Sequence, residues 1–210
     1  MESTAFRRYA AIAAANLRHN FLPHLLLALG VLALTPVIFG INDLDAQAAA
    51  VPLECFASLI GAILLTPIFL PEDDPQVYET VSARYTGCLP VWILRTLYSL
   101  AAAAVLLGGF TLLMRGLGSE VSLSLYFGAL SSAAFLGGLG VLAGGASGNV
   151  AVGYMLPVMY YVFSWMGGQK MLGMFQLFSI TMGDGSGKGW LLAGGLLLTA
   201  AGLTIRSLRR

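Results

Sequence analysis

The sequence LPEDDPQVYETVSARYTGCLPVWILR, residues 70–95, lies between two long apolar runs of the chain. It contains four of the ten acidic residues and two of the eleven basic residues. The rest of the sequence is either strongly apolar or forms a short tail or loop. This contrast predicts a membrane protein with one substantial polar segment, which we expect to lie on the cytoplasmic side.

The composition excludes a water-soluble domain. Of the 210 residues, 58% are hydrophobic and only 10% are charged, and the mean hydropathy is +0.82. Soluble domains carry about 25% charged residues, so we expect the bilayer to be the solvent of this chain. The net charge of +1 and the absence of an internal basic run give no indication of nucleic-acid binding.

Apolar runs of about 20 residues are long enough to cross a bilayer as helices. The uncharged stretch 121–169 would be about 74 Å long as one helix, so we expect two spans there, separated by a turn at 144–149. The sequence thus predicts a single all-α transmembrane domain, 1–210, with six spans at about 21–41, 46–70, 96–114, 121–143, 150–169 and 189–205.

Two shorter segments do not fit a membrane crossing. Residues 5–19 place apolar side chains on one helical face and arginines on the other, which predicts an interfacial helix. Residues 171–183, before the sixth span, are apolar but too short to cross, which predicts a re-entrant or interfacial segment. The following loop fails the phosphate-loop pattern, because Met182 and Gly189 stand at two of its required positions.

The distribution of lysine and arginine predicts the orientation. If the N-terminus is cytoplasmic, eight of these residues lie inside and three outside, as the positive-inside rule requires. The inner residues are Arg7, Arg8, Arg18, Arg84, Arg95, Arg206, Arg209 and Arg210, and the outer ones are Arg115, Lys170 and Lys188. We therefore expect a multi-pass protein of a cell membrane, a bacterial plasma membrane in our interpretation, with both termini in the cytoplasm.

Candidate catalytic residues are scarce. The sequence has two histidines and no HExxH or GxSxG pattern, so we expect neither an enzyme nor a bound metal or cofactor. Glu54 is the one acidic residue inside a span. Two interpretations of it are open: a polar contact for a transported solute or a neighbouring protomer, or a hydrogen-bonded or protonated carboxyl group near the outer boundary. Tyr154 and Met159 of the fifth span likewise either line a translocation path or face lipid and core.

The polar segment has the pattern of a short helix. Asp74 is a suitable N-cap before Pro75 at the first helical position, and Gly87 follows the expected end. An apolar stripe runs along this helix through Tyr78, Val81 and Tyr85, with Val77 beside it. The stripe either packs against the inner ends of the protein's own spans or docks in the groove of a soluble partner.

The chain resembles the membrane subunit of ABC-2 type ABC transporters. The local similarity lies in the acidic sequence TPIFLPEDDP, residues 66–75, at the end of the second span, followed by ETVSAR, residues 79–84. The architecture is also similar: an N-terminal interfacial helix, six spans, a cytoplasmic coupling helix over 72–87, and a re-entrant segment before the sixth span. This similarity covers nearly the whole chain.

The resemblance implies a permease powered by a separate cytosolic ATPase that binds ATP. A second copy or a related permease would complete a dimer in the lipid membrane, and the cargo would be an exported peptide, lipid or drug-like compound. The implied ATPase-coupling residues are Glu72, Asp73, Asp74, Val77, Tyr78, Val81, Arg84 and Tyr85. Two alternatives stay open: a stand-alone secondary carrier or channel, and a membrane immunity protein that binds a ligand without moving it.

Overall fold

The computed structural model describes residues 16–72, 88–167 and 169–209, and no strand occurs among them. The helical elements, with η marking π- and 3₁₀-segments, are η1 (Leu17–Phe21), α2 (Leu22–Phe39), α3 (Ala46–Val51), η2 (Pro52–Phe56), η3 (Ala57–Leu59), α4 (Ile60–Leu65), η4 (Thr66–Glu72), α6 (Cys88–Gly116), α7 (Leu123–Ser147), α8 (Val150–Trp165), α9 (Gln169–Leu172), η5 (Gly173–Phe175) and α10 (Lys188–Leu208). The prediction of an all-α chain is confirmed over these residues.

Five helices in the described part of the chain are long and apolar enough to cross a membrane: Leu22–Phe39, Ala46–Glu72, Cys88–Gly116, Leu123–Ser147 and Lys188–Leu208. A multi-pass membrane protein is therefore the appropriate description. The fifth expected span, 150–169, is the one without a counterpart among these five; it corresponds to α8, which is apolar but has 16 residues. Its length of about 24 Å is less than the hydrocarbon core of about 30 Å.

Two helices extend beyond the expected ends of their spans. The third span was expected at 96–114, and α6 also includes the described residues from Cys88 to Arg95, because this run contains enough apolar residues to continue the helix. The turn expected at 144–149 is shorter. Helix α7 continues to Ser147, Gly148 ends it at φ +72°, and Asn149 caps α8 by accepting a hydrogen bond from the Ala151 amide. The predicted helices over 5–19 and 72–87 lie outside the described residues, apart from the residues at their edges.

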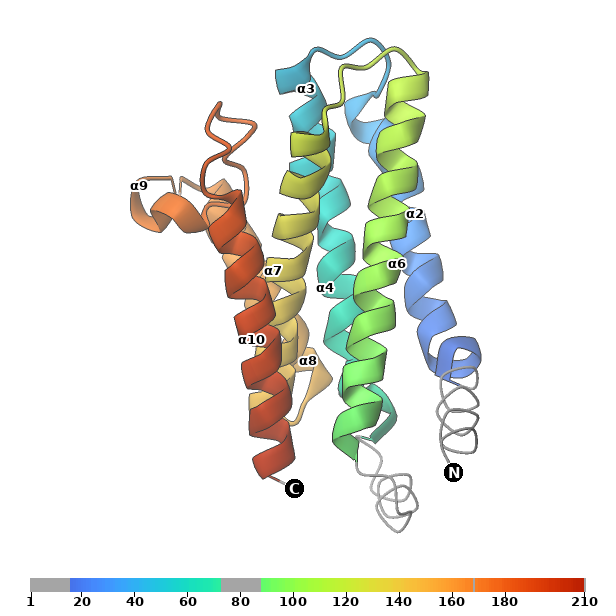
Figure 1. Cartoon of the computed structure of the whole chain (residues 1–210), viewed down its shortest axis with the longest axis vertical. Coiled ribbons are helices and arrows are strands. Elements are labelled where there is room, and N and C mark those ends of the chain that lie inside the picture. Colours follow the sequence, from blue (N-terminus) through green and yellow to red (C-terminus); the bar gives the residue numbers. More distant parts are fainter. Residues whose placement is uncertain (1–15, 73–87, 168, 210) are drawn as a thin grey trace.

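The helices form an elongated bundle with α7 at its centre (Figure 1). Helix α7 packs most extensively against α10 and also contacts α8, α4 and α6. Helices α2 and α6 stand on the other side of α4. Helix η1 begins and α10 ends at the same end of the bundle, which we call the termini end, and the α2–α3 and α6–α7 connections lie at the opposite or far end.

Glycines allow α7 and α10 to approach at backbone distance. A β-carbon on Gly138 would lie 2.4 Å from the carbonyl oxygen of Gly195, and one on Gly145 would lie 2.4 Å from that of Gly202. Such distances exclude any side chain, so only glycine fits at these crossings. Small residues promote close helix packing in membranes because lipid gives apolar surfaces no reason to associate. These glycines of α7 therefore serve packing within the chain.

The second span is not a regular helix. Between Ala46 and Glu72 it changes from α to π at Pro52, then to 3₁₀, back to α at Ile60, and again to 3₁₀ at Thr66. Proline lacks an amide hydrogen and cannot continue the regular bonding pattern, which explains the change at Pro52. π-segments occur frequently at functional sites, and this one contains Glu54.

Candidate functional site

Two buried ion pairs lie in this apolar bundle, one near each end, and they are the candidate functional site. The far-end cluster consists of Glu54, Ser132, Leu177, Thr181 and Lys188. The termini-end cluster consists of Asn16, Glu72, Trp92, Arg95 and the carbonyl group of Ile68. Both ion pairs bridge segments that are distant in the sequence.

In the far-end cluster, Glu54 meets Lys188. The Glu54 side chain is completely buried, and its Oε1 lies 2.6 Å from the Nζ of Lys188. Its Oε2 accepts hydrogen bonds from the Thr181 amide at 2.8 Å and the Thr181 hydroxyl at 2.7 Å. The Ile180 amide donates to Oε1 at 3.3 Å. Both carboxylate oxygens thus have partners within the chain.

Lys188 is held from three sides. Besides the contact with Glu54, its Nζ donates to the hydroxyl of Ser132 at 2.9 Å and to the carbonyl oxygen of Leu177. Ser132 belongs to α7 and also donates to the Leu177 carbonyl at 3.2 Å. A buried ammonium group needs such a complete set of acceptors, because an unpaired charge in a medium of low dielectric is very costly.

These contacts attach the connection between α8 and α10, residues 173–187, to the bundle. The Tyr160 hydroxyl donates to the Phe175 carbonyl at 2.6 Å, and the Leu177 amide donates to the Ser164 hydroxyl at 3.3 Å. At the other edge, the Gln47 amide group donates to the Thr181 carbonyl at 3.3 Å. The connection stays at the far-end half of the bundle (Figure 1) and does not cross it.

The π-segment η2 brings Glu54 to this position. Its wider turn leaves the Cys55 carbonyl available to the hydroxyl of Tyr161 on α8, while the Ser58 hydroxyl donates to the Glu54 carbonyl at 2.5 Å. A regular α-helix would bond these carbonyl groups within its own backbone. The irregular backbone therefore joins η2 to α8 as well as to the 173–187 connection.

The termini-end cluster is a second buried ion pair. Glu72 and Arg95 form two parallel hydrogen bonds, NH1 to Oε2 and NH2 to Oε1, each 2.6 Å long. The indole Nε1 of Trp92 donates to Oε2 at 3.1 Å, and Arg95 also donates to the Ile68 carbonyl at 2.7 Å. With its amide oxygen turned toward the guanidinium group, Asn16 accepts from Arg95 Nε at 2.6 Å. Bidentate pairs of this kind are among the strongest hydrogen bonds in proteins.

This cluster includes one of the residues that the resemblance assigned to ATPase coupling. Glu72 is 3% exposed and contacts its own chain at the base of the 73–87 segment. The other expected coupling residues lie outside the described residues: Asp73, Asp74, Val77, Tyr78, Val81, Arg84 and Tyr85. Glu72 immediately precedes the 73–87 segment, and Trp92 and Arg95 follow this segment within the first two turns of α6. The contacts of Glu72 with Trp92 and Arg95 therefore join the two flanks of the 73–87 segment.

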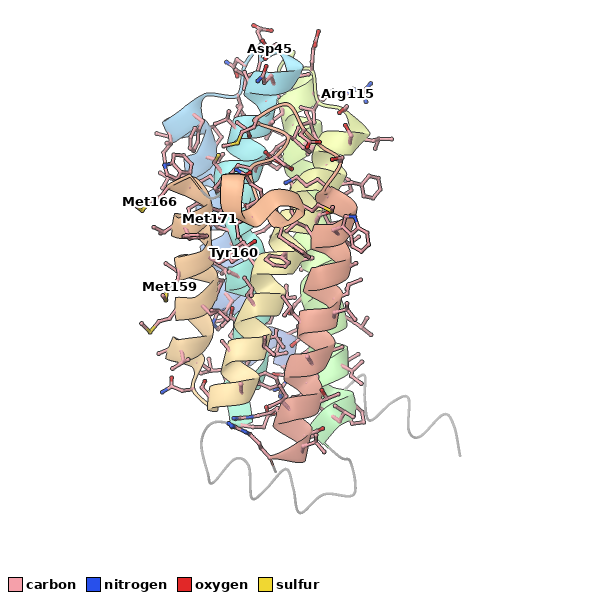
Figure 2. All side chains as sticks on the ribbon, turned by 90° about the vertical axis from the view of Figure 1, so that its left-hand side faces the viewer. Asp45, Arg115, Met159, Tyr160, Met166 and Met171 are labelled. Atoms are coloured by element: carbon pink, nitrogen blue, oxygen red, sulfur yellow. The ribbon has the colours of Figure 1, made fainter. Side chains whose placement is uncertain are left out.

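The three residues expected along a translocation path do not converge within one chain. Glu54 is in the far-end cluster. The Tyr154 hydroxyl faces the second span and lies 3.4 Å from the Ile63 carbonyl oxygen. Met159 is 64% exposed on the outer face of α8 (Figure 2). A path that uses all three would need a further protein surface.

Sequence reasoning missed the basic partners of both ion pairs. Lys188 was interpreted as a residue of an outer loop and Arg95 as the end of a cytoplasmic segment. A usable signal was present for Arg95, because it stands three residues after Trp92 in a run that is otherwise apolar. For Lys188 the sequence offers no comparable signal, since a glycine-rich loop precedes it.

Among the described residues, no three His, Cys, Asp or Glu side chains come together as a candidate metal site. Comparison of the chain with protein-family models, with curated proteins and with solved structures gives no match.

Proposed function

We propose that the chain is the membrane permease subunit of an ABC-2 type ABC transporter, driven by a separate cytosolic ATPase. One observation carries this proposal: the buried, bidentate Glu72–Arg95 ion pair joins the two flanks of the 73–87 segment. A segment whose two bases are fixed to each other can transmit a push from a bound partner into the membrane helices. A freely jointed loop would absorb the same displacement.

The transmitted displacement would reach three helices of the bundle. Glu72 ends the second span and Arg95 belongs to α6, while Asn16 precedes α2. A movement of the segment therefore acts on three helices through one hydrogen-bonded cluster. In energetic terms this is a coupling between an ATPase-binding site and the membrane helices through a rigid element.

In this proposal α8 is also a membrane crossing, the fifth in chain order, which brings the number of crossings to six. Its 16 residues span the core together with the 173–187 connection that follows, and local thinning of the bilayer accommodates the difference in length at modest cost. Six crossings place both termini on one side, in agreement with the common end of η1 and α10 in Figure 1 and with the excess of basic residues at that end. We assign this side to the cytoplasm.

A dimer of two permease chains completes the translocation path. Large apolar side chains are exposed along α8, including Met155, Met159 and Phe163, and they provide a surface for a second copy or a related chain. The path between the two chains would carry an amphiphilic or apolar cargo outward, since few charged residues lie in the spans. The far-end cluster holds the 173–187 connection in place across the outer end of this path.

The test is co-purification with the ATPase. Replacing Tyr78, Val81 and Tyr85 by Asp should release the ATPase and abolish ATP-dependent transport, while the protein still inserts in the membrane. The matched control replaces the same residues by Phe, Ile and Phe, which preserves the apolar stripe and should retain the ATPase. Retention of the ATPase by the Asp variant would refute the docking assignment. Transport by the reconstituted chain alone, without ATP, would instead support a secondary carrier.

A further inference from the structure

The connection before α10 borders an open cavity of about 310 Å³. The cavity lies between η5 and the loop that leads to Lys188, on the far-end half of the bundle. Its lining residues are Gly173, Met174, Gln176, Ser179, Asp184, Ser186 and Gly187. At Gly187 a β-carbon would lie 2.5 Å from the Met174 carbonyl oxygen, so glycine at this position allows the two walls to approach each other.

Two polar side chains of the lining lack adequate partners within the described chain. The Ser179 hydroxyl oxygen is buried and has no hydrogen-bond partner. Gln176 is 2% exposed, and the one hydrogen bond of its side chain runs from Nε2 to the sulfur of Met182 at 3.1 Å. Sulfur is a weak acceptor, and buried polar groups in native proteins almost always have partners. A bound polar molecule would supply partners for these two groups.

The charge of the cavity is negative. Asp184 is the one charged residue among those that line it. The Ser186 amide donates to Asp184 Oδ1 at 2.9 Å, and hydrogen bonds from Ser186 lower the pKa of the Asp184 carboxyl group below its ordinary value of 3.8. The group is thus a carboxylate at neutral pH, and it favours a ligand with one positive charge.

The size and lining of the cavity favour an occupant larger than a bare metal ion. A water molecule takes up about 30 Å³ in the liquid, so the cavity could accommodate roughly ten molecules of that size. A single carboxylate with amide and hydroxyl groups also provides less charge than protein sites for divalent cations usually do. A small organic molecule with several hydrogen-bonding groups fits both the volume and the lining.

We propose that this cavity binds a small organic cation, whose primary ammonium group pairs with Asp184 and whose hydroxyl groups bond Ser179 and Gln176. The proposal goes beyond the transport function and does not depend on it. Binding needs only the 173–187 connection, which the far-end cluster fixes to the bundle. The same ammonium chemistry occurs in soluble amino sugars and in the ethanolamine headgroup of a lipid.

The experiment uses the full chain in detergent micelles and isothermal titration with glucosamine. A ligand of 12 non-hydrogen atoms at about 0.3 kcal/mol per atom binds with a dissociation constant on the order of millimolar. N-acetylglucosamine keeps the sugar ring but lacks the charge, and it should not bind detectably. Asp184→Asn and Ser179→Ala should each weaken glucosamine binding, the former by about tenfold or more, because a charged hydrogen bond is lost.

Glu120→Gln is the matched control, since it removes an exposed acidic side chain at the far end, outside the cavity. This variant should bind glucosamine as the unmodified chain does. Added phosphatidylethanolamine that competes with glucosamine supports the site and identifies a lipid headgroup as its occupant. Equal affinity for the amine and the acetylated sugar, or binding unaffected by Asp184→Asn, would overturn the proposal.

Discussion

The far-end ion pair allows a quantitative test of the structure. Lys188→Met removes the ammonium group but leaves Glu54 with the donors of Ile180 and Thr181. Glu54→Gln removes the carboxylate and leaves a buried ammonium group with two neutral oxygen acceptors, from Ser132 and Leu177. Breaking a buried pair costs about 3–5 kcal/mol. We expect Lys188→Met near the lower limit and Glu54→Gln near the upper limit.

The assay is thermal unfolding of the purified chain, followed by tryptophan fluorescence. For a chain of this length 1 kcal/mol corresponds to about 2–4 °C in Tm, so a cost of about 3 kcal/mol lowers Tm by roughly 6–12 °C. The double variant leaves no unpaired charge, so its loss should be smaller than the sum of the two single losses by about 1 kcal/mol or more.

Strict additivity of the two changes would refute the ion pair, because two residues without contact contribute independently. Glu120→Gln is again the control, and it should change Tm very little, as expected for an exposed side chain without a special role. A large loss of stability in this control would show that the assay reports general sensitivity to lost charge.

Three further predictions concern other parts of the molecule. Gly138→Ala should destabilise the chain by about 1–3 kcal/mol through overpacking, because its β-carbon would overlap α10. Gly109→Ala is the control, since open space surrounds that position, and it should be neutral or slightly stabilising in the same unfolding assay. The next test uses a chain whose other two tryptophans are replaced by phenylalanine. There Glu72→Gln should change the fluorescence emission of Trp92, because its indole loses a charged acceptor. An unchanged spectrum would contradict the termini-end cluster. The contribution of Asp184 to glucosamine binding is present above the ordinary carboxyl pKa of 3.8 and is lost as the pH falls through the lowered pKa, so titrations at about pH 5 and about pH 6.5 should give equal affinities.

Hydropathy predicted the helical membrane bundle and most span positions, because a bilayer forces each long apolar run into a helix. It could not predict where α6 begins, since Arg95 looks like the end of a polar segment until Glu72 is seen to neutralise it. The termini-end pair depends on a contact between residues 23 positions apart, which the spacing of residues does not reveal.

The site was less predictable than the fold. Glu54 could be identified as unusual from its apolar surroundings, and its interpretation as a hydrogen-bonded carboxyl group agrees with its position in the structure. Its partner could not be found, because Lys188 lies 134 residues later and reaches it only after the intervening helices have packed. The change to a π-segment at Pro52 was also missed, since hydrophobic periodicity does not distinguish α from π over five residues.

The far-end ion pair also has a consequence for how the chain is made. Glu54 leaves the ribosome 134 residues before Lys188, a delay of roughly 7–27 s at 5–20 residues per second. During this interval an acidic side chain, which would cost about 2.5–3.5 kcal/mol at the helix centre and less toward the helix end, must enter the bilayer without its partner. Insertion of α10 completes the pair, so a nascent chain truncated before that helix carries an intramembrane acid without its basic partner.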